Sequence, residues 1–222
     1  MIHLSTLDTI SINWQGCVNP TVKHRGIPML LQRLAALITL IIISPILVIT
    51  MLLIRQESKG GCFFSQDRIG RYGRHFRIYK FRSMYLKTDP RYQEPDPTTS
   101  DRNGVCKKYK VDPRITKVGR FIRKYSIDEL PQLFNIVNAD MAFIGPRPAL
   151  SIEVYEYPTE AFSRLHGFPG LSGLWQVSGR ANTNFQTQLE LDQRYLRQQS
   201  IYLDFYLLLK TVPSVVFAKG AY

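Results

Sequence analysis

The chain has 222 residues, enough for one domain of ordinary size with a hydrophobic core, with or without an appendage. It carries 29 Lys and Arg against 17 Asp and Glu, and this net charge of +12 suits anionic partners such as nucleic acid, acidic lipid headgroups or phosphorylated small molecules. Its three cysteines are far apart and its histidines lack metal-binding spacing. This pattern argues against a disulfide framework or a structural zinc site and favours a reducing, cytosol-facing location.

The N-terminal part of the chain divides into a polar segment and an apolar one. Residues 1–27 show no periodicity, which predicts a tail or a lead-in helix. Residues 34–54 carry no charge and are long enough to cross a bilayer as a helix, but Ser44 and Pro45 at their middle should bend it. Basic residues flank both ends, and positive charge marks the cytoplasmic side. A hairpin that enters one leaflet and returns, and a spanning helix with a proline kink, both remain open.

The segment after the apolar stretch is predicted to be a β-hairpin. Residues 62–65 and 75–81 have strand composition, and Gly70 and Gly73 supply the turn. Lys80 and Arg82 lie among many basic residues here, which indicates either a solvated face beside acidic lipids or a phosphate site. The proline-containing residues 87–113 predict a long loop, and helices are expected at 182–197 and, as an apolar helix, at 201–217.

Residues 126–138 contain the candidate chemistry. Apolar residues recur at helical spacing from 130 to 137, and Pro131 requires the helix to begin only a few residues earlier. Asp128 and Glu129 then fall in its first turn, where free N–H groups and the helix dipole favour negative charge. One interpretation is an ordinary capping box between Ser126 and Glu129, and the other is a reactive carboxylate pair.

Three arginines could converge on this pair. Arg123 precedes it, Arg147 lies between two prolines that rigidify its backbone, and Arg180 ends the motif 173–180. Arginines bind phosphate oxygens, and a carboxylate pair can hold Mg²⁺ while one member attacks phosphorus. Each of these signals is weak when it is taken alone.

Five stretches in a fixed order make a more specific pattern. They are 78–84 (IYKFRSM), 112–116 (DPRIT), 126–133 (SIDELPQL), 145–148 (GPRP) and 173–180 (GLWQVSGR). Together they resemble the bacterial sugar transferases, which are monotopic polyprenyl-phosphate phosphoglycosyl transferases, and the resemblance extends from about residue 25 to the end of the chain. The chain resembles the catalytic part of larger members.

The resemblance implies a reaction: transfer of a phospho-sugar from a UDP-hexose to undecaprenyl phosphate, with release of UMP, as the first membrane step of surface glycan synthesis (exopolysaccharide, O-antigen or lipopolysaccharide). It implies that Asp128 forms a phosphosugar–aspartyl intermediate and that Glu129, with Asp128, holds Mg²⁺. The implied phosphate- and substrate-binding residues are Arg123, Arg147, Arg180, Lys80 and Arg82. Since Asp128 must be ionised to attack, we expect the helix N-terminus and nearby arginines to keep its pKa low.

The implied fold is an α+β domain with a small antiparallel sheet on a membrane hairpin. Its parts are a tail (1–27), a re-entrant helix broken at Ser44-Pro45 (28–54) and a cytosolic catalytic domain with an apolar C-terminal helix (55–222). The implied location is the cytoplasmic face of the bacterial inner membrane, against anionic headgroups. The resemblance implies no nucleic-acid partner, and the oligomeric state, including a homodimer, stays open. Two rivals are a membrane-tethered nucleic-acid-binding protein and an enzyme in which the lipid phosphate attacks directly.

Overall fold

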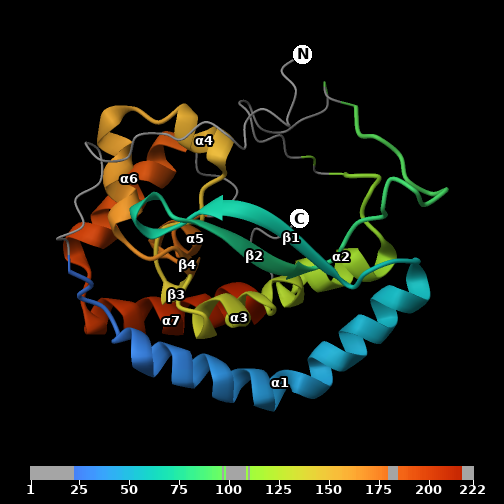
Figure 1. The fold of residues 1–222 in the computed structure, drawn as a ribbon, viewed down its shortest axis with the longest axis horizontal. Coiled ribbons are helices and arrows are strands. Elements are labelled where there is room, and N and C mark those ends of the chain that lie inside the picture. The colour runs from blue at the N-terminus through green and yellow to red at the C-terminus, as the bar shows by residue number, and fades with distance from the viewer. Residues whose placement is uncertain (1–22, 97, 99–108, 110, 180–184, 217–222) are drawn as a thin grey trace.

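A computed structural model describes residues 23–96, 98, 109, 111–179 and 185–216, and Figure 1 shows a mixed helix-and-strand fold with two small sheets. The helices are α1 (Met29–Glu57), α2 (Lys117–Lys124), α3 (Gln132–Val137), α4 (Ser151–Tyr155), α5 (Leu174–Val177), α6 (Phe185–Gln198) and α7 (Ile201–Val216). The strands are β1 (Phe63–Ile69), β2 (His75–Phe81), β3 (Ala142–Ile144) and β4 (Gly170–Ser172), and short 3₁₀ turns are η3 (Arg71–Gly73), η5 (Ile127–Glu129) and η6 (Thr159–His166). This confirms the expected mixture of helices and small sheets.

The apolar N-terminal segment forms one long helix, α1, which bends as it passes along the domain (Figure 1). Pro45 lies inside it, where it removes a backbone hydrogen bond, and Ser44 Oγ donates to the Ile41 carbonyl at 2.8 Å. The predicted bend is therefore present, within a continuous helix. Among the described residues, α1 alone has the length and composition to cross a membrane, and its position relative to a bilayer remains a prediction.

Both ends of α1 are bound to the same domain. Near its start, Gln32 Oε1 accepts from the Phe143 N–H at 2.8 Å, and Arg33 Nε donates to the Val137 carbonyl at 2.8 Å. At its end, the Glu57 carboxylate accepts from the first two N–H groups of α2, at 2.6 and 2.8 Å. The helix is thus attached along the domain rather than extending away from it.

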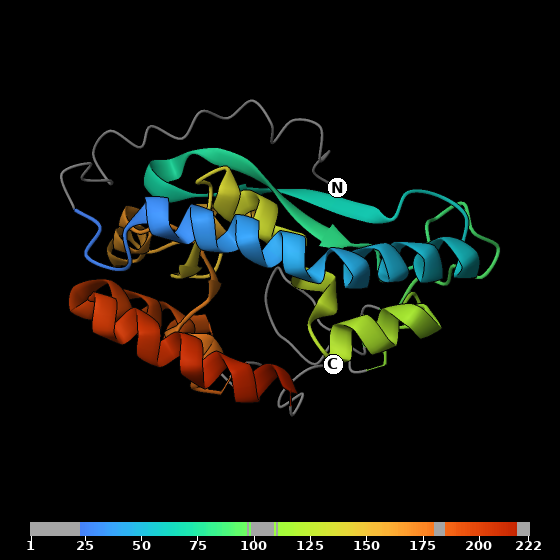
Figure 2. The same ribbon diagram turned by 90° about the horizontal axis from the view of Figure 1, so that it is seen from below.

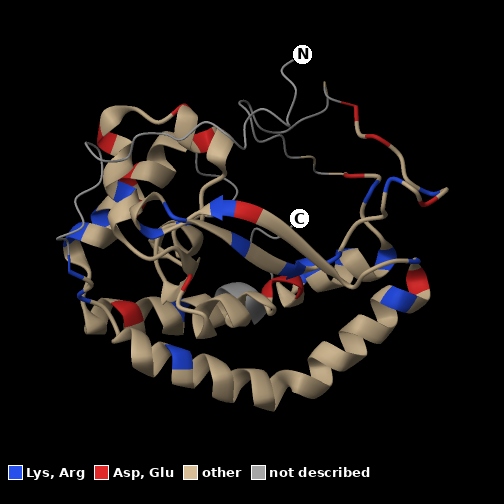
Figure 3. Cartoon of the chain, viewed as in Figure 1, with Lys and Arg blue, Asp and Glu red and all other residues tan. Residues whose placement is uncertain are grey.

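One face of α1 completes the main hydrophobic core, and the other is exposed. The buried face contributes Ala36, Leu40, Leu47 and Ile54, which cluster with buried residues of β2, α2 and α3. The opposite face exposes large apolar side chains, such as Ile42 at 71%. Figure 2 shows α1 and α7 side by side on this underside, and α7 also exposes apolar side chains, such as Leu209 at 72%. Figure 3 shows that charged residues on α1 lie only near its ends. A surface of this kind marks an interaction with lipid or protein.

The two sheets differ in how well the sequence predicted them. β1 and β2 pair antiparallel, with Phe63 opposite Phe81, as expected for the hairpin. β3 and β4 pair in parallel, which the sequence analysis did not predict. Gly145 follows β3 and Gly170 begins β4, and their backbones approach so closely that a Cβ on Gly170 would lie 2.1 Å from the Gly145 nitrogen. This contact fixes the start of the segment 145–148 against β4.

Candidate active site

The carboxylate pair lies in the 3₁₀ turn η5, one turn before α3 begins. The prediction that it occupies the first turn of a longer helix was wrong, and so was the capping box. Ser126 adopts the left-handed conformation (φ 55°), whereas an N-cap needs extended dihedrals, and its own N–H donates to the Arg123 carbonyl. The sharp turn at Ser126 instead carries the chain from α2 directly into Asp128 and Glu129.

Strand β2 supplies the counter-charge of the pair. Lys80 Nζ lies 2.5 Å from Glu129 Oε1, and both side chains are partly buried. The structure therefore brings the predicted residues Lys80 and Glu129 together. This contact competes with any backward contact from Glu129 to Ser126, which gives a second reason why no capping box forms.

A buried asparagine, which the sequence analysis overlooked, holds the pair against β2. Asn135 in α3 is fully buried, its Oδ1 accepts from the Tyr79 N–H at 3.1 Å, and its Nδ2 donates to the Arg77 carbonyl at 2.7 Å. These bonds fix the register between β2 and the η5–α3 segment, and so place Lys80 opposite Glu129. Asn135 lies off the apolar face formed by residues 130, 133, 134 and 137, so no local pattern in the sequence marked it as buried.

The electrostatics of Asp128 differ from the expectation. Burial of its carboxyl, followed by the negative charge of Glu129, raises its pKa to about 7, although Lys80 and Arg123 act in the opposite direction. The prediction of a low pKa was wrong because the pair sits in a short turn, and the neighbouring carboxylate and desolvation outweigh the two cations. Near neutral pH Asp128 is therefore only partly ionised, and shifts of this kind are common at catalytic sites.

The predicted arginines occupy different places. Arg123 lies in the last turn of α2 and is close enough to Asp128 to lower its pKa. Arg147 is partly exposed after β3, and its guanidinium carbon lies 5.7 Å from the centroid of the Trp175 ring. No hydrogen bond or ion pair joins Arg147 to the dyad within the described part of the chain. Arg180 lies outside the described residues.

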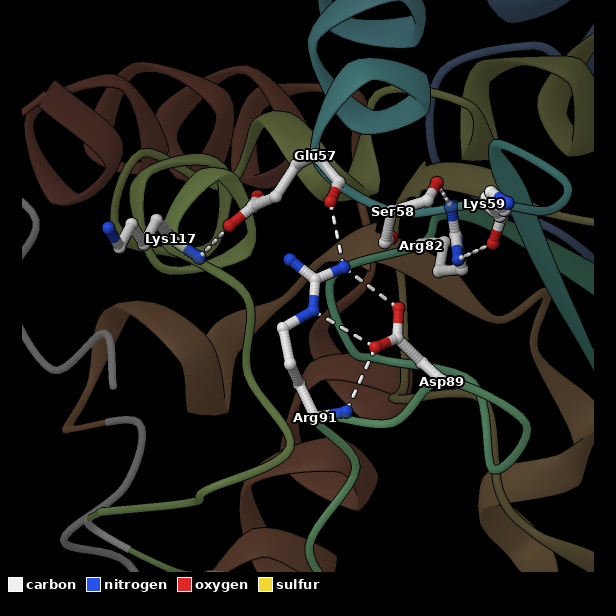
Figure 4. Close-up of polar contacts among 7 residues, drawn as sticks. All are labelled: Glu57, Ser58, Lys59, Arg82, Asp89, Arg91 and Lys117. Atoms are coloured by element: carbon white, nitrogen blue, oxygen red, sulfur yellow. Dashed lines mark hydrogen bonds and ion pairs between the residues drawn. The ribbon is translucent and has the colours of Figure 1, made fainter.

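Arg82 binds the end of α1 rather than the dyad, as Figure 4 shows. It is 5% exposed, and its guanidinium donates to the main-chain carbonyls of Ser58 at 2.8 Å and Lys59 at 2.9 Å. The assignment of Arg82 to substrate binding stays a prediction, but its guanidinium already has these partners in the structure. Since Lys80 precedes it by two residues on the same chain segment, β2 connects the end of α1 to Glu129.

A second connection runs through α2 (Figure 4). Arg91 donates to the main-chain carbonyl of Glu57 at 2.9 Å while it pairs with Asp89, and the Glu57 carboxylate caps the start of α2 at the Lys117 N–H. α2 ends at Lys124, immediately before the dyad. The sequence did not point to Glu57, because its partners lie 60 and 61 residues further along the chain.

The dyad suits a magnesium ion that is shared with a substrate. Mg²⁺ usually binds one or two carboxylates together with substrate phosphates rather than a complete protein cage. Among the residues that the structure describes, no group of three or more His, Cys, Asp or Glu could hold a metal ion. The mutual repulsion that raises the pKa of Asp128 would be relieved by a cation. Asp128 and Glu129 therefore fit the expected ligands.

Comparison with known proteins gives matches over most of the chain. Residues 24–218 match the model of a family described as bacterial sugar transferase. The chain is 37% identical over 192 residues to the exopolysaccharide production protein ExoY of Rhizobium meliloti (strain 1021), with 85% of each chain covered. It is 42% identical over 188 residues to the galactosyl transferase CpsE of Streptococcus agalactiae, and this alignment covers 84% of the chain but 41% of the relative.

A further relative is the undecaprenyl-phosphate galactose phosphotransferase of Salmonella typhimurium, which is 39% identical over 190 residues. The alignment covers 84% of this chain and 40% of that protein, so the similarity concerns one part of the larger relative. The family match spans most of the chain and includes the dyad, the Arg147 segment and both apolar helices. The chain belongs to the bacterial sugar transferase family.

Proposed function

We propose that this protein transfers a sugar 1-phosphate from a UDP-hexose to undecaprenyl phosphate at the cytoplasmic face of the bacterial inner membrane, at the start of surface glycan synthesis. The observation that carries the proposal is the Asp128–Glu129 dyad, which lies between Lys80 and Arg123 on a domain whose underside is apolar. Both substrates are anionic, and the cations around the dyad suit them. Two relatives are named undecaprenyl-phosphate galactose phosphotransferase and undecaprenyl-phosphate glucose phosphotransferase, which supports the lipid acceptor and a hexose as the sugar.

In the first step, a carboxylate oxygen of Asp128 attacks the phosphorus that bears the sugar. A bond from this oxygen to phosphorus forms, the bond from phosphorus to the bridging oxygen breaks, and UMP leaves with the electron pair. Asp128 must be ionised for the attack, and Lys80 and Arg123 favour its charged form. When bound, Mg²⁺ on Asp128 and Glu129 would supply charge neutralisation for the phosphate oxygens.

In the second step, a phosphate oxygen of undecaprenyl phosphate attacks the same phosphorus. The phosphorus–aspartate bond breaks, and Asp128 regains its carboxylate as undecaprenyl diphosphate sugar forms. The acceptor can stay in the bilayer, because the apolar faces of α1 and α7 lie on one side of the domain that carries the dyad.

The attachment of α1 supports a monotopic rather than a spanning arrangement. The helix is long enough to cross a bilayer, so a spanning α1 would place its two ends on opposite sides. Both ends, however, hydrogen-bond to the same domain, at Arg33 and Glu57. An α1 that enters one leaflet and returns, with its bend near Ser44 and Pro45, satisfies both attachments.

The test is release of UMP from a panel of UDP-galactose, UDP-glucose and UDP-N-acetylgalactosamine, with and without undecaprenyl phosphate. We expect lipid-dependent turnover with one of these donors, and loss of turnover in Asp128→Asn. UDP-sugar without lipid should label Asp128 with the sugar phosphate, detected by mass spectrometry. An active Asp128→Asn enzyme would support direct attack by the lipid phosphate, and salt-sensitive DNA binding without turnover would support the nucleic-acid rival.

A further inference from the structure

The backbone of Arg147 is held by a buried ion pair that the proposed chemistry does not use. Arg164 in η6 and Asp192 in α6 are 2% and 1% exposed, and they pair with each other. Arg164 Nη2 also donates to the Arg147 carbonyl at 3.1 Å. The Arg147 N–H faces the Asp192 carboxylate and opposes the rise in its pKa that burial causes. The pair therefore binds both polar groups of the Arg147 main chain.

The rest of the segment 146–148 is equally fixed. Pro146 and Pro148 have no N–H, so the Arg147 N–H is the only main-chain donor among these three residues. The Pro146 carbonyl accepts from the Gly170 N–H at 2.8 Å, and the Pro148 carbonyl accepts from Arg68 at 3.1 Å. All backbone donors and acceptors of the segment are thus occupied. Only the side chain of Arg147 retains freedom, and it lies beside Trp175 within cation–π distance.

Stability alone does not account for this arrangement. A buried ion pair costs desolvation energy, and apolar residues of similar volume usually stabilise a core as well or better. In the described part of the chain, Arg164 Nε and Asp192 Oδ1 also remain buried without hydrogen-bond partners. An apolar pair could not provide a hydrogen-bond donor and an acceptor that both face the main chain of Arg147.

We propose that Arg164 and Asp192 are positioning residues that fix the guanidinium of Arg147 for a phosphate group of the nucleotide-sugar donor. This rests on the proposed function, since it assigns the donor to Arg147. The pair fixes the backbone, Trp175 supports the side chain, and the guanidinium fork is presented with little entropy left to lose on binding. Loss of the pair should therefore weaken donor binding more than it slows the chemical step.

The test is the variant Arg164→Met with Asp192→Leu, which keeps the core filled but removes both bonds to Arg147. Its matched control is Tyr157→Phe. This change removes the other side-chain partner of Arg164 but leaves the bond from Arg164 to the Arg147 carbonyl in place. We expect the double variant to unfold at a temperature close to that of the parent and to raise KM for the UDP-sugar at least tenfold. The control should leave KM within twofold.

A cycle with Arg147→Ala distinguishes positioning from a general effect of packing. If the pair acts through Arg147, adding Arg147→Ala to the double variant should change KM little further. The proposal is overturned if the fold-increases in KM from the double variant and from Arg147→Ala multiply in the combined variant. It is also overturned if KM is unchanged in the double variant. If the double variant does not fold, Asp192→Asn replaces it, because it keeps the side-chain volume but removes the charge that holds Arg164 Nη2 beside the Arg147 carbonyl.

A second readout is independent of catalysis. In a Trp14→Phe background, Trp175 is the only tryptophan of the chain, so its fluorescence reports the side chain that lies beside it. We expect acrylamide to quench Trp175 more strongly in the double variant, by as much as in Arg147→Ala. Unchanged quenching contradicts the positioning role. If the parent protein releases no UMP but quenching still increases in the double variant, the positioning role stands and the proposed function is rejected.

Discussion

Lys80 Nζ lies 2.5 Å from Glu129 Oε1, and this contact joins the second strand of the hairpin to the carboxylate pair. Lys80 also lowers the pKa of Asp128, so it stabilises the charged form of the proposed nucleophile. The same ammonium is thus placed to balance the two carboxylates and, when substrate is bound, to face its phosphates.

Replacement of Lys80 by Met should reduce kcat for UMP release by about 10²-fold, the usual scale for losing one charged group that stabilises a transition state. The nucleophile would lose a cation that favours its ionised form. Initial rates at saturating UDP-sugar and lipid measure the effect. Lys124→Met is the matched control, since Lys124 is exposed at the end of α2 and should leave kcat nearly unchanged. Equal losses in both variants would contradict a specific role for Lys80.

The pKa of Asp128 predicts a pH-dependent cost in stability. A carboxyl whose pKa is about 7 in the folded protein and near 3.8 otherwise binds its proton more tightly when folded. Its stabilising contribution is complete below the lower value and is lost as the pH rises to about 7. Wild-type protein in EDTA should therefore lose stability between pH 5 and pH 8 relative to Asp128→Asn, which stays neutral.

The expected difference is up to about 3 kcal/mol, since the two pH units between pH 5 and the pKa of about 7 each correspond to about 1.4 kcal/mol. Thermal unfolding of both proteins at pH 5 and pH 8 measures it, and the gap in Tm should widen at pH 8 in favour of Asp128→Asn. The exposed Glu156→Gln, in the same buffers, controls for general charge effects. A gap that stays constant with pH would show that Asp128 is ionised throughout this range.

Local patterns in the sequence predicted the features that depend on neighbouring residues. The uncharged run 34–54 gave α1, and the glycines at 70 and 73 located the turn between β1 and β2. These predictions succeeded because turns and apolar helices are determined largely by residues close in the chain.

Contacts between distant residues were beyond this kind of prediction. β3 and β4 are short, and their parallel pairing depends on the close approach of Gly145 and Gly170. The left-handed backbone of Ser126 prevents the predicted capping box. The raised pKa of Asp128 results mainly from burial, which no local pattern reveals. Only the three-dimensional structure shows that Lys80 in β2 contacts Glu129 while Arg82, directly after β2, binds the end of α1.

Glu57 provides a test of how α1 is joined to the domain. Its carboxylate accepts from the Lys117 and Val118 N–H groups, at the positive end of α2. Glu57→Ala leaves both groups without this partner and should lower the free energy of unfolding by about 1–2 kcal/mol, the range for losing a helix cap. For a chain of this size, Tm should fall by roughly 2–8 °C. Glu156→Ala serves as the control, and an equal Tm in the two variants would contradict the capping role.

The attachment of both ends of α1 also predicts which side of the membrane each end faces. In a background without the three native cysteines, single cysteines replace Lys23 and Lys59, which are exposed before and after the helix. A maleimide that cannot cross membranes should label neither site from the periplasmic side of intact cells, and both after lysis. Labelling of one site in intact cells would mean that α1 spans the bilayer. The domain would then have to release one of its two bonded ends, at Arg33 or at Glu57.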